Sequence, residues 1–388
     1  MNESLNELMR DATRLTRGGQ IKEATAALQR WLTGHQSAAA PAEPSQTPAA
    51  QTDVLDGCVF EIERLDAQIK ESGSACERRE APVQRQAGSL NGSLNGAFIA
   101  GVHSDASLTR HYKLYVPPGA HAGQPLPLIV MLHGCTQNPD DFAAGTGMNE
   151  RAREQGCFVL YPAQSQEANS SRCWNWFKHN HQQRGRGEPA LIASLTQAVM
   201  AQHAVDPDRV FVAGLSAGGA MAAIMGASYP DLYAAVGVHS GLPPGAANNV
   251  AEALSAMNGG VLAALPRGVQ RKPALSIATI VFHGDQDKTV NPLNGSQVMD
   301  ARLSGDAAPA TAPRLEQGTS PQGRRFTRKV YADAAGHALG EHWIVHGAGH
   351  AWSGGSPAGS YTDPLGPDAT GEMLRFFFEH AKQAGSPP

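Results

Sequence analysis

Short apolar runs alternate with helical stretches along the chain from about residue 97 onward. Continuous apolar runs bounded by turn residues are typical of strands buried on both faces of a sheet, and they occur at 126–132, 157–161, 210–213, 234–239 and 277–282. Stretches with helical periodicity lie between them, at 148–155, 189–203, 217–228 and 294–302. This alternation predicts an α/β domain with a mostly parallel sheet and helices on both faces.

The flanks of this pattern predict further elements. Residues 98–102 and 111–116 read as a strand hairpin ahead of the first buried run. Later strands are expected near 326–331 and 343–345, followed by a helix over 368–382. We therefore expect a catalytic domain over 97–388.

The N-terminal third has a different pattern. Two apolar stripes with helical spacing flank Gly18-Gly19, which predicts a helical hairpin over 1–33. We expect its apolar faces to dock on the main domain or on a second copy of the chain, or alternatively to adhere to a hydrophobic surface such as a polymer granule. Residues 34–96 are rich in Ala, Pro, Ser and other polar residues, which predicts a flexible linker.

Composition narrows the function classes. The formal net charge of -4 over 388 residues, with both signs mixed, gives no footprint for nucleic acid. No apolar run reaches the roughly 18 residues of a membrane span, so we expect no transmembrane segment. The first residues lack a basic region followed by an apolar core, so we expect a cytoplasmic protein, or a secreted one if a signal has been removed. The five cysteines are too few and too irregular for a disulfide scaffold or a C-x-x-C zinc site.

The segment at 209–221 carries the strongest chemical signal. Gly214-Leu215-Ser216-Ala217-Gly218 follows an apolar strand and opens a small-residue helix, which is the context of a nucleophile elbow. Glycine at 214 and 218 leaves room for a serine held on a sharp turn. The sequence therefore predicts Ser216 as a nucleophile, with the N–H of Ala217 facing the oxyanion formed on attack.

The other members of a triad are expected on loops after later strands. Asp287 follows the run that ends at residue 282 and is the preferred acid, with Asp285 as the alternative. His350, in a Gly-rich turn after the last expected strand, is the preferred base, with His346 as its rival. On a helix, His342, His346 and His350 could bind zinc, but the glycines among them argue against a helix and thus against a metal site.

The loop after the first long buried strand should supply the second oxyanion donor. Gly134 permits close approach of the backbone, and the N–H of Cys135 is the expected donor; a nucleophilic Cys135 is the competing interpretation. Trp174, Trp176 and Trp352 lie on predicted loops. They either form a wall that contacts substrate or fill the core.

Five segments in this order resemble the poly(3-hydroxybutyrate) depolymerase family of esterases, whose relatives are feruloyl and acetylxylan esterases: 133–137, 173–176, 214–219, 283–287 and 349–355. The resemblance covers roughly residues 97–383. It implies an α/β-hydrolase fold and carboxylic ester hydrolysis, supports Ser216, Asp287 and His350 as the triad, and supports Cys135 and Ala217 as oxyanion donors. It also implies a disulfide at Cys135 in secreted members, with Cys173 as the partner to test.

The chain departs from the secreted depolymerases in two respects: it has no visible signal peptide, and it leaves no room for a C-terminal polymer-binding module. We therefore expect a serine esterase acting on short hydroxyalkanoate polyesters, oligomers or small esters through an acyl-enzyme, without metal or organic cofactor. The alternatives are a feruloyl or acetylxylan esterase, a serine peptidase on the same fold, and a non-catalytic surface-binding protein that retains a relic hydrolase domain.

Overall fold

The computed structural model describes residues 95–105, 108–120, 123–259, 275–304 and 311–382. The predicted helical hairpin and almost all of the predicted linker lie outside these residues, so the division of the chain into 1–33, 34–96 and 97–388 stays a prediction.

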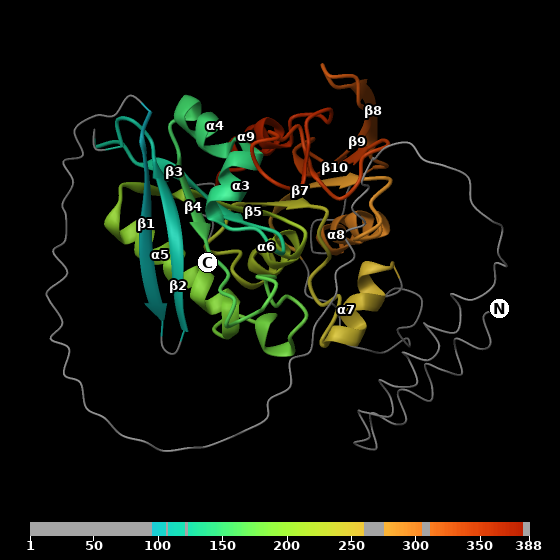
Figure 1. The fold of residues 1–388 in the computed structure, drawn as a ribbon. Helices are drawn as coiled ribbons and strands as arrows, with labels where there is room; N and C mark the ends of the chain where they lie inside the picture. Colours follow the sequence, from blue (N-terminus) through green and yellow to red (C-terminus); the bar gives the residue numbers. More distant parts are fainter. Residues whose placement is uncertain (1–94, 106–107, 121–122, 260–274, 305–310, 383–388) are drawn as a thin grey trace, which may run out of the picture. The chain divides into compact units, whose positions relative to one another are not determined.

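The described residues form a mixed sheet with the strand order β1-β2-β4-β3-β5-β6-β7-β10-β9-β8 (Figure 1). The strands from β4 to β10 in this order run parallel. Their bounds are β4 (Phe158–Pro162), β3 (Leu126–Leu132), β5 (Val205–Leu215), β6 (Ala235–His239), β7 (Ala278–Gly284) and β10 (Ala338–Val345). Each overlaps a segment predicted to form a strand, and most of their residues are buried.

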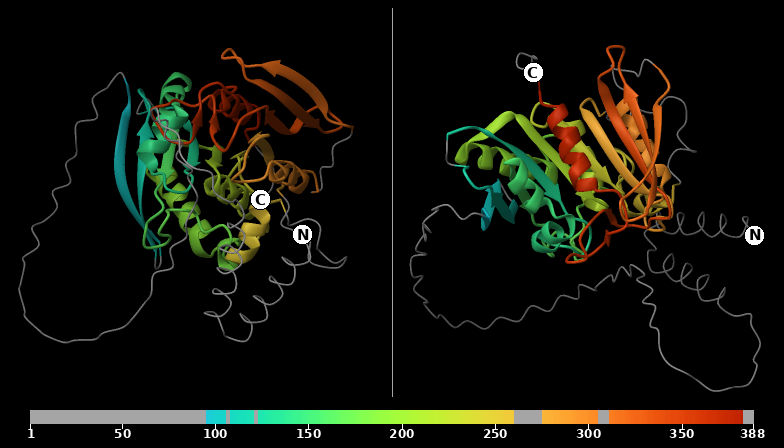
Figure 2. Two further views of the ribbon diagram at one scale, coloured as in Figure 1. Left: turned by 45° about the vertical axis from the view of Figure 1, so that its right-hand side comes forward. Right: turned by 90° about the horizontal axis from the view of Figure 1, so that it is seen from above.

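Antiparallel strands extend the sheet at both ends. β1 (Ala97–Asp105) and β2 (Leu108–Val116) form the predicted hairpin and pair with β4 through β2. At the other end, β9 (Arg325–Ala332) pairs with β10, and β8 (Arg314–Thr319) pairs with β9; this hairpin projects at the edge of the domain in Figure 2. β8 escaped prediction because most of its residues are exposed and none forms an apolar run. A short parallel pair, β11 (Trp352–Ser353) and β12 (Thr362–Asp363), lies apart from this sheet.

Helices cover both faces of the sheet, as predicted (Figure 1). One face packs against α5 (Gly187–Gln202), α6 (Ala217–Ser228), α7 (Val250–Met257) and α8 (Leu293–Leu303). The other packs against α3 (Pro139–Thr146), α4 (Met148–Gln155) and α9 (Ala369–Glu379). Alternate residues of the strands divide between the two resulting cores: Val130 faces the first, and Ile129 and Met131 face the second.

Two short helices were not predicted. α3 begins after Asn138, whose side chain accepts hydrogen bonds from the N–H groups of Asp140 and Asp141. α7 begins in the same way after Asn249, which caps the N–H of Glu252. Such caps fix a helix start locally without the long apolar period that signals a helix in sequence. A single 3-10 turn, η1 (His179–His181), precedes α5.

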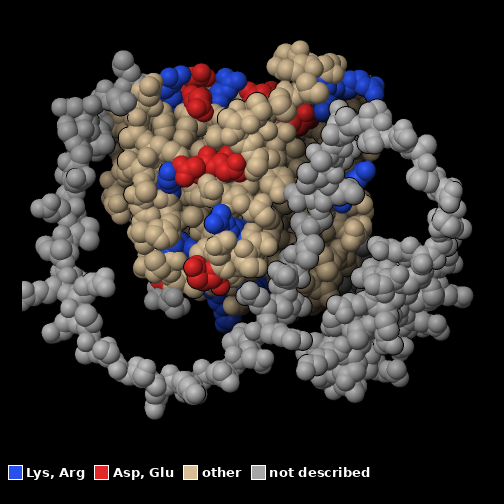
Figure 3. Space-filling view, in the orientation of Figure 1, with Lys and Arg blue, Asp and Glu red and all other residues tan. Residues whose placement is uncertain are grey.

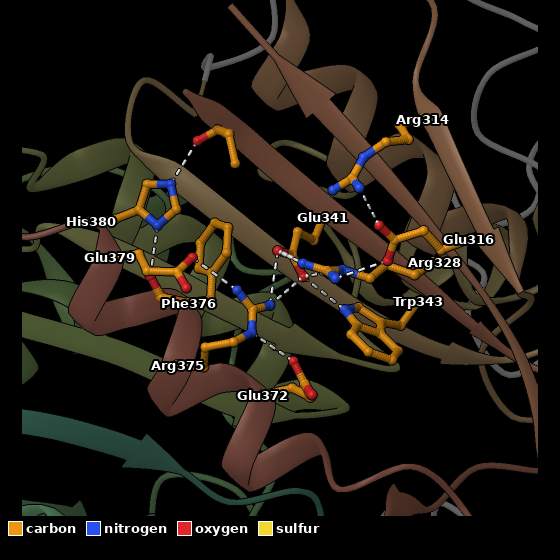
Figure 4. A network of polar contacts seen from close by, with 11 residues as sticks. Arg314, Glu316, Arg328, Glu341, Trp343, Glu372, Arg375, Phe376, Glu379 and His380 are labelled. Atoms are coloured by element: carbon orange, nitrogen blue, oxygen red, sulfur yellow. Dashed lines mark hydrogen bonds and ion pairs between the residues drawn. The ribbon is translucent and has the colours of Figure 1, made fainter. Parts of the chain in front are cut away.

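A buried carboxylate ties α9 to the sheet (Figure 4). Glu341 in β10 accepts hydrogen bonds from Arg328 Nε in β9 at 2.9 Å, from Trp343 Nε1 at 3.0 Å, and from Arg375 Nη2 in α9 at 2.8 Å. Burial would raise the pKa of Glu341, but hydrogen bonds from the two guanidinium groups outweigh it and lower that pKa. Glu341 is therefore ionised and joins three elements.

On the face seen in Figure 3, Lys and Arg side chains lie beside Asp and Glu side chains. Among the helices of the described residues, none combines the length and the apolar character that a membrane span needs.

Candidate active site

The carboxyl ends of β3, β5, β6, β7 and β10 meet at one edge of the sheet, because these strands are parallel and adjacent. Cys135, Ser216, Asp287 and His350 lie in the segments that follow β3, β5, β7 and β10, respectively. Loops at this edge are where α/β proteins build their sites.

Ser216 occupies the sharp turn between β5 and α6. Its backbone has φ 58° and ψ -120°, a conformation that residues other than glycine rarely adopt. The Ser216 N–H donates to the carbonyl oxygen of His239 at 2.9 Å. A Cβ atom at Gly214 would lie 2.4 Å from the carbonyl carbon of Gly218, so the turn requires the small residues of the motif. The elbow geometry inferred from sequence is present.

Asp287 and His350 form a buried pair. His350 Nδ1 lies 2.7 Å from Asp287 Oδ2, and the two side chains are 11% and 0% exposed. Asp287 Oδ1 accepts from the N–H groups of Thr289 at 2.9 Å and Val290 at 2.8 Å, which fixes the carboxylate. Because the carboxylate accepts a hydrogen bond from the Nδ1–H group, His350 Nε2 is the nitrogen left to take up a proton.

The Asp287 carboxylate has a second imidazole beside it. His283 Nε2 lies 3.4 Å from Asp287 Oδ2 and 2.9 Å from the carbonyl oxygen of Val290. Burial would raise the pKa of Asp287, but hydrogen bonds from His283 and His350, with the charge of His350, outweigh burial and lower it well below the usual range. The acid of the pair is thus ionised.

His239 connects the nucleophile turn to the segment after His350. Its carbonyl oxygen accepts the Ser216 N–H, and its Nε2 accepts the N–H of Ser353 at 2.9 Å. Burial lowers the pKa of His239 far below its usual value, and the nearby His283 and His350 lower it further. Sequence reasoning missed this residue, although its position at the end of β6, on the same sheet edge, was a usable signal.

A hydrogen bond between Ser216 Oγ and His350 Nε2 is not among the contacts that the described residues make. The structure therefore joins acid to base and puts the serine on the same edge. Nucleophile–base hydrogen bonds are often loose before substrate binds.

The loop after β3 lies against Ser216. A Cβ atom at Gly134 would lie 3.6 Å from Ser216 Cβ, and the Gly134 N–H donates to Gln137 Oε1 at 2.9 Å. Behind this loop His133 is buried: its Nδ1 donates to Gly134 O at 2.7 Å, and its Nε2 accepts the N–H of Gln164 at 3.1 Å. Burial lowers the pKa of His133 to about 4, so a neutral imidazole supports the loop.

Cys135 and Cys173 form a disulfide, with an S–S distance of 2.04 Å, which is the pairing suggested by the family resemblance. The bond fixes Cys135, the residue after Gly134, to the loop before η1. A sulfur held in a disulfide is no nucleophile, so the alternative of a nucleophilic Cys135 is wrong.

The three tryptophans lie in the core. Trp174 and Trp352 are 0% and 1% exposed, and Trp176 is 5% exposed. Trp352 stacks on His239 with ring centroids 5.0 Å apart, and Trp174 packs against His133 at 5.7 Å. Their assignment to a substrate-contacting wall is corrected, because packing leaves their rings no free face. Trp352 and Trp174 thus pack against buried histidines, whereas Trp176 packs against Phe177.

The rival triad members pair with each other. His346 Nδ1 lies 2.9 Å from Asp285 Oδ2, so neither joins the Asp287–His350 pair. His342 is buried within β10, a strand, which removes the helical spacing behind the zinc alternative. In the part of the chain that the structure describes, no three His, Cys, Asp or Glu side chains converge as a metal site.

Residues 110–317, more than half of the 388, match the family model described as Esterase PHB depolymerase. The poly(3-hydroxyalkanoate) depolymerase C of Paucimonas lemoignei is 34% identical over 247 residues, which cover 61% of this chain and 57% of that protein. The acetylxylan esterase A of Talaromyces purpureogenus is 27% identical over 291 residues, covering 68% of this chain and 72% of that one.

Among solved structures, an acetyl xylan esterase from Aspergillus awamori superposes with a TM-score of 0.54 at 18% identity, covering 72% of this chain and 99% of that one. With the parallel sheet covered on both faces, this likeness identifies the α/β-hydrolase fold. The chain spans less than two thirds of the length of the Paucimonas protein.

Proposed function

This chain belongs to the PHB depolymerase family of esterases, and from that premise we propose that it is a serine hydrolase of carboxylic esters. In this proposal Ser216 is the nucleophile, His350 the base and Asp287 the acid that orients it. The observation that carries it is the buried Asp287–His350 pair, 2.7 Å apart, on the same sheet edge as a serine with positive φ.

The reaction is a two-step acyl transfer. His350 Nε2 takes the proton of Ser216 as Oγ forms a bond to the ester carbonyl carbon, and the resulting oxyanion is held by the N–H groups of Cys135 and Ala217. Collapse of this intermediate breaks the ester C–O bond, and His350 returns the proton to the leaving alcohol. Water, deprotonated by the same imidazole, then attacks the acyl-enzyme and releases the acid. No step requires a metal or organic cofactor.

The substrates we propose are short hydroxyalkanoate oligomers and small esters. Similarity to a poly(3-hydroxyalkanoate) depolymerase supports the hydroxyacyl group. Similarity to an acetylxylan esterase supports a second candidate, an acetyl ester of a polysaccharide. Both candidates use the same site, since they differ only in the groups flanking the carbonyl.

A substrate panel tests the proposal. We expect the full chain to hydrolyse hydroxybutyrate oligomers with a higher kcat/KM than methyl ferulate or acetylated xylan, and Ser216→Ala to lose all three activities by several orders of magnitude. A preference for acetylated xylan would favour the second candidate. Unchanged hydrolysis by Ser216→Ala would refute the triad, and an inactive parent chain would favour a relic hydrolase domain that only binds surfaces.

We also propose that the protein works in an oxidising compartment. The Cys135–Cys173 disulfide supports this, because such bonds persist outside the reducing cytosol. This replaces the cytoplasmic expectation, which rested on the first residues alone. Trapping free thiols by alkylation in intact cells should leave both cysteines unmodified; modification of both would contradict it.

A further inference from the structure

Two Asp–His pairs join the same two loops. After β7 the chain carries Asp285 and Asp287, and after β10 it carries His346 and His350. The inner pair, Asp287–His350, is the proposed acid and base. In the outer pair, His346 Nδ1 lies 2.9 Å from Asp285 Oδ2, and the side chains are 33% and 32% exposed.

Asp285 uses both carboxylate oxygens on the loop that carries His350. Oδ2 accepts from His346 Nδ1, and Oδ1 accepts from the N–H of Gly347 at 2.7 Å. Burial would raise the pKa of Asp285, but these two hydrogen bonds lower it, so the carboxylate is ionised and the bonds are charge-assisted.

Backbone contacts bring the two loops to a fixed register. The Asp285 N–H donates to Val345 O at 3.1 Å, and the Gln286 N–H donates to Ala348 O at 3.0 Å. A Cβ atom at Gly284 would lie 2.3 Å from Ala348 O, so the loops touch along their backbones.

His346 is held at both ring nitrogens. Nδ1 donates to Asp285, and Nε2 lies 2.9 Å from Thr327 Oγ1 in β9. Because an ionised carboxylate only accepts hydrogen bonds, Nδ1 is the donor to Asp285, and Nε2 shares a hydrogen bond with the Thr327 hydroxyl. The imidazole therefore links the loop after β7 to β9, four residues before His350.

We propose that Asp285 and His346 are positioning residues for the reaction: together they clamp the loop that presents His350. This inference rests on the proposed function. A displacement of about 1 Å of a catalytic group can cost on the order of 100-fold in rate, so a clamp on this short loop governs kcat. Thr327, His346 and Asp285 repeat the hydroxyl–imidazole–carboxylate series, but Thr327 lies inside strand β9, where no helix start supplies oxyanion donors.

The site permits clean substitutions. Asp285, His346 and Leu365 line an open depression of about 420 Å³, so alanine at either clamp position leaves no sealed cavity. A control exists in the β9–β10 turn, where His337 Nδ1 lies 3.3 Å from Asp333 Oδ2 in a second Asp–His pair, whose His337 side chain is 77% exposed.

The test measures kcat and KM of the parent and the variants with 4-nitrophenyl acetate as substrate. Active sites are counted by titration with a fluorophosphonate, and kcat is expressed per active site. We expect Asp285→Ala and His346→Ala to lower kcat about 10- to 100-fold with KM changed less than about threefold. His346→Asn keeps an N–H near the Nδ1 position and should recover most of kcat, whereas His346→Gln, whose N–H lies near Nε2, should not. Asp333→Asn should match the parent.

Equal kcat per titrated site for Asp285→Ala, His346→Ala and Asp333→Asn would overturn the clamp, even if melting temperatures fall. Failure of His346→Asn to exceed His346→Gln would also overturn it, because the Nδ1 contact would then carry no weight. Loss of activity in Ser216→Ala alongside unaffected clamp variants would refute the clamp while leaving the proposed function standing.

Discussion

A Cβ atom at Gly218 would lie 1.9 Å from the carbonyl oxygen of Leu132. The first turn of α6 thus presses on the end of β3, and this contact sets the loop after β3 beside Ser216. An added Cβ atom would clash with a backbone atom, so rotation of a side chain could not relieve the contact.

We therefore predict that Gly218→Ala destabilises the protein and lowers kcat at least about 100-fold, because the elbow must move to admit the methyl group. Thermal unfolding and ester hydrolysis measure the two effects. Gly226→Ala is the matched control in the same helix: its Cβ would meet only side chains, at 3.1 Å or more, and activity should stay within about twofold. Equal behaviour of the two variants would contradict the contact.

Replacing the acid should separate catalysis from folding. Asp287→Asn keeps the side-chain volume but no longer favours the Nδ1–H tautomer of His350, so we expect kcat to fall about 1,000- to 10,000-fold with little change in KM. Asp333→Asn, in the β9–β10 turn, is the control and should match the parent. A loss of less than tenfold in Asp287→Asn would show that another group orients the base.

The sequence predicted the parts of the site that are local. The Gly214–Ser216–Gly218 spacing encodes its own turn, and the motif order predicted that Asp287 and His350 follow later strands, as they do after β7 and β10. Longer-range packing was beyond prediction: whether a tryptophan lines a pocket or fills the core depends on distant partners, such as His239 for Trp352.

The fold was predictable where burial makes strands continuous and apolar, as in β3 and β7. The fold was not predictable at β8, because this strand has no apolar run and is recognised only by its antiparallel hydrogen bonding to β9. Nor does a pattern reveal that Asp285 and His346 pair with each other, because that contact follows from the register of β7 and β10.

The network around Glu341 should govern stability rather than activity (Figure 4). Glu341→Gln removes a charge that is 1% exposed and paired with two arginines, so we expect a loss of about 2–4 kcal/mol in the free energy of unfolding. Glu379→Gln, whose side chain is 54% exposed and pairs with Arg375, should cost less than about 0.5 kcal/mol. Denaturant unfolding compares the two.

The same network gives a pH dependence with a definite sign. The pKa of Glu341 is lower in the folded state than the unfolded value of about 4.3, so its contribution is complete above that value and is lost as pH falls through the folded pKa. The stability gap between the parent and Glu341→Gln should therefore narrow as pH falls from about 5 to about 3. A gap that widens there would contradict the assignment of an ionised Glu341.

The disulfide should stabilise both the fold and the loop after β3, which carries the proposed oxyanion donor Cys135. Its half-cystines are 38 residues apart. Closing a loop of this length lowers the entropy of the unfolded chain, which stabilises the folded state by about 3–4 kcal/mol at 25 °C. The double variant Cys135→Ser/Cys173→Ser should lose about that much stability and at least about tenfold in kcat. Reductant should lower the stability and kcat of the parent by similar amounts and should leave the double variant unchanged. A loss of stability or kcat in the reduced double variant would show that the reductant acts on something other than this disulfide.

In the proposed mechanism, His350 activates Ser216. The most direct measurement is mass spectrometry of the full chain after reaction with a fluorophosphonate. We predict one adduct, located on Ser216, that is absent in Ser216→Ala and forms at least about 100-fold more slowly in His350→Ala. An adduct on any other residue, or no adduct in a protein that still hydrolyses esters, would refute the role of Ser216 as the nucleophile.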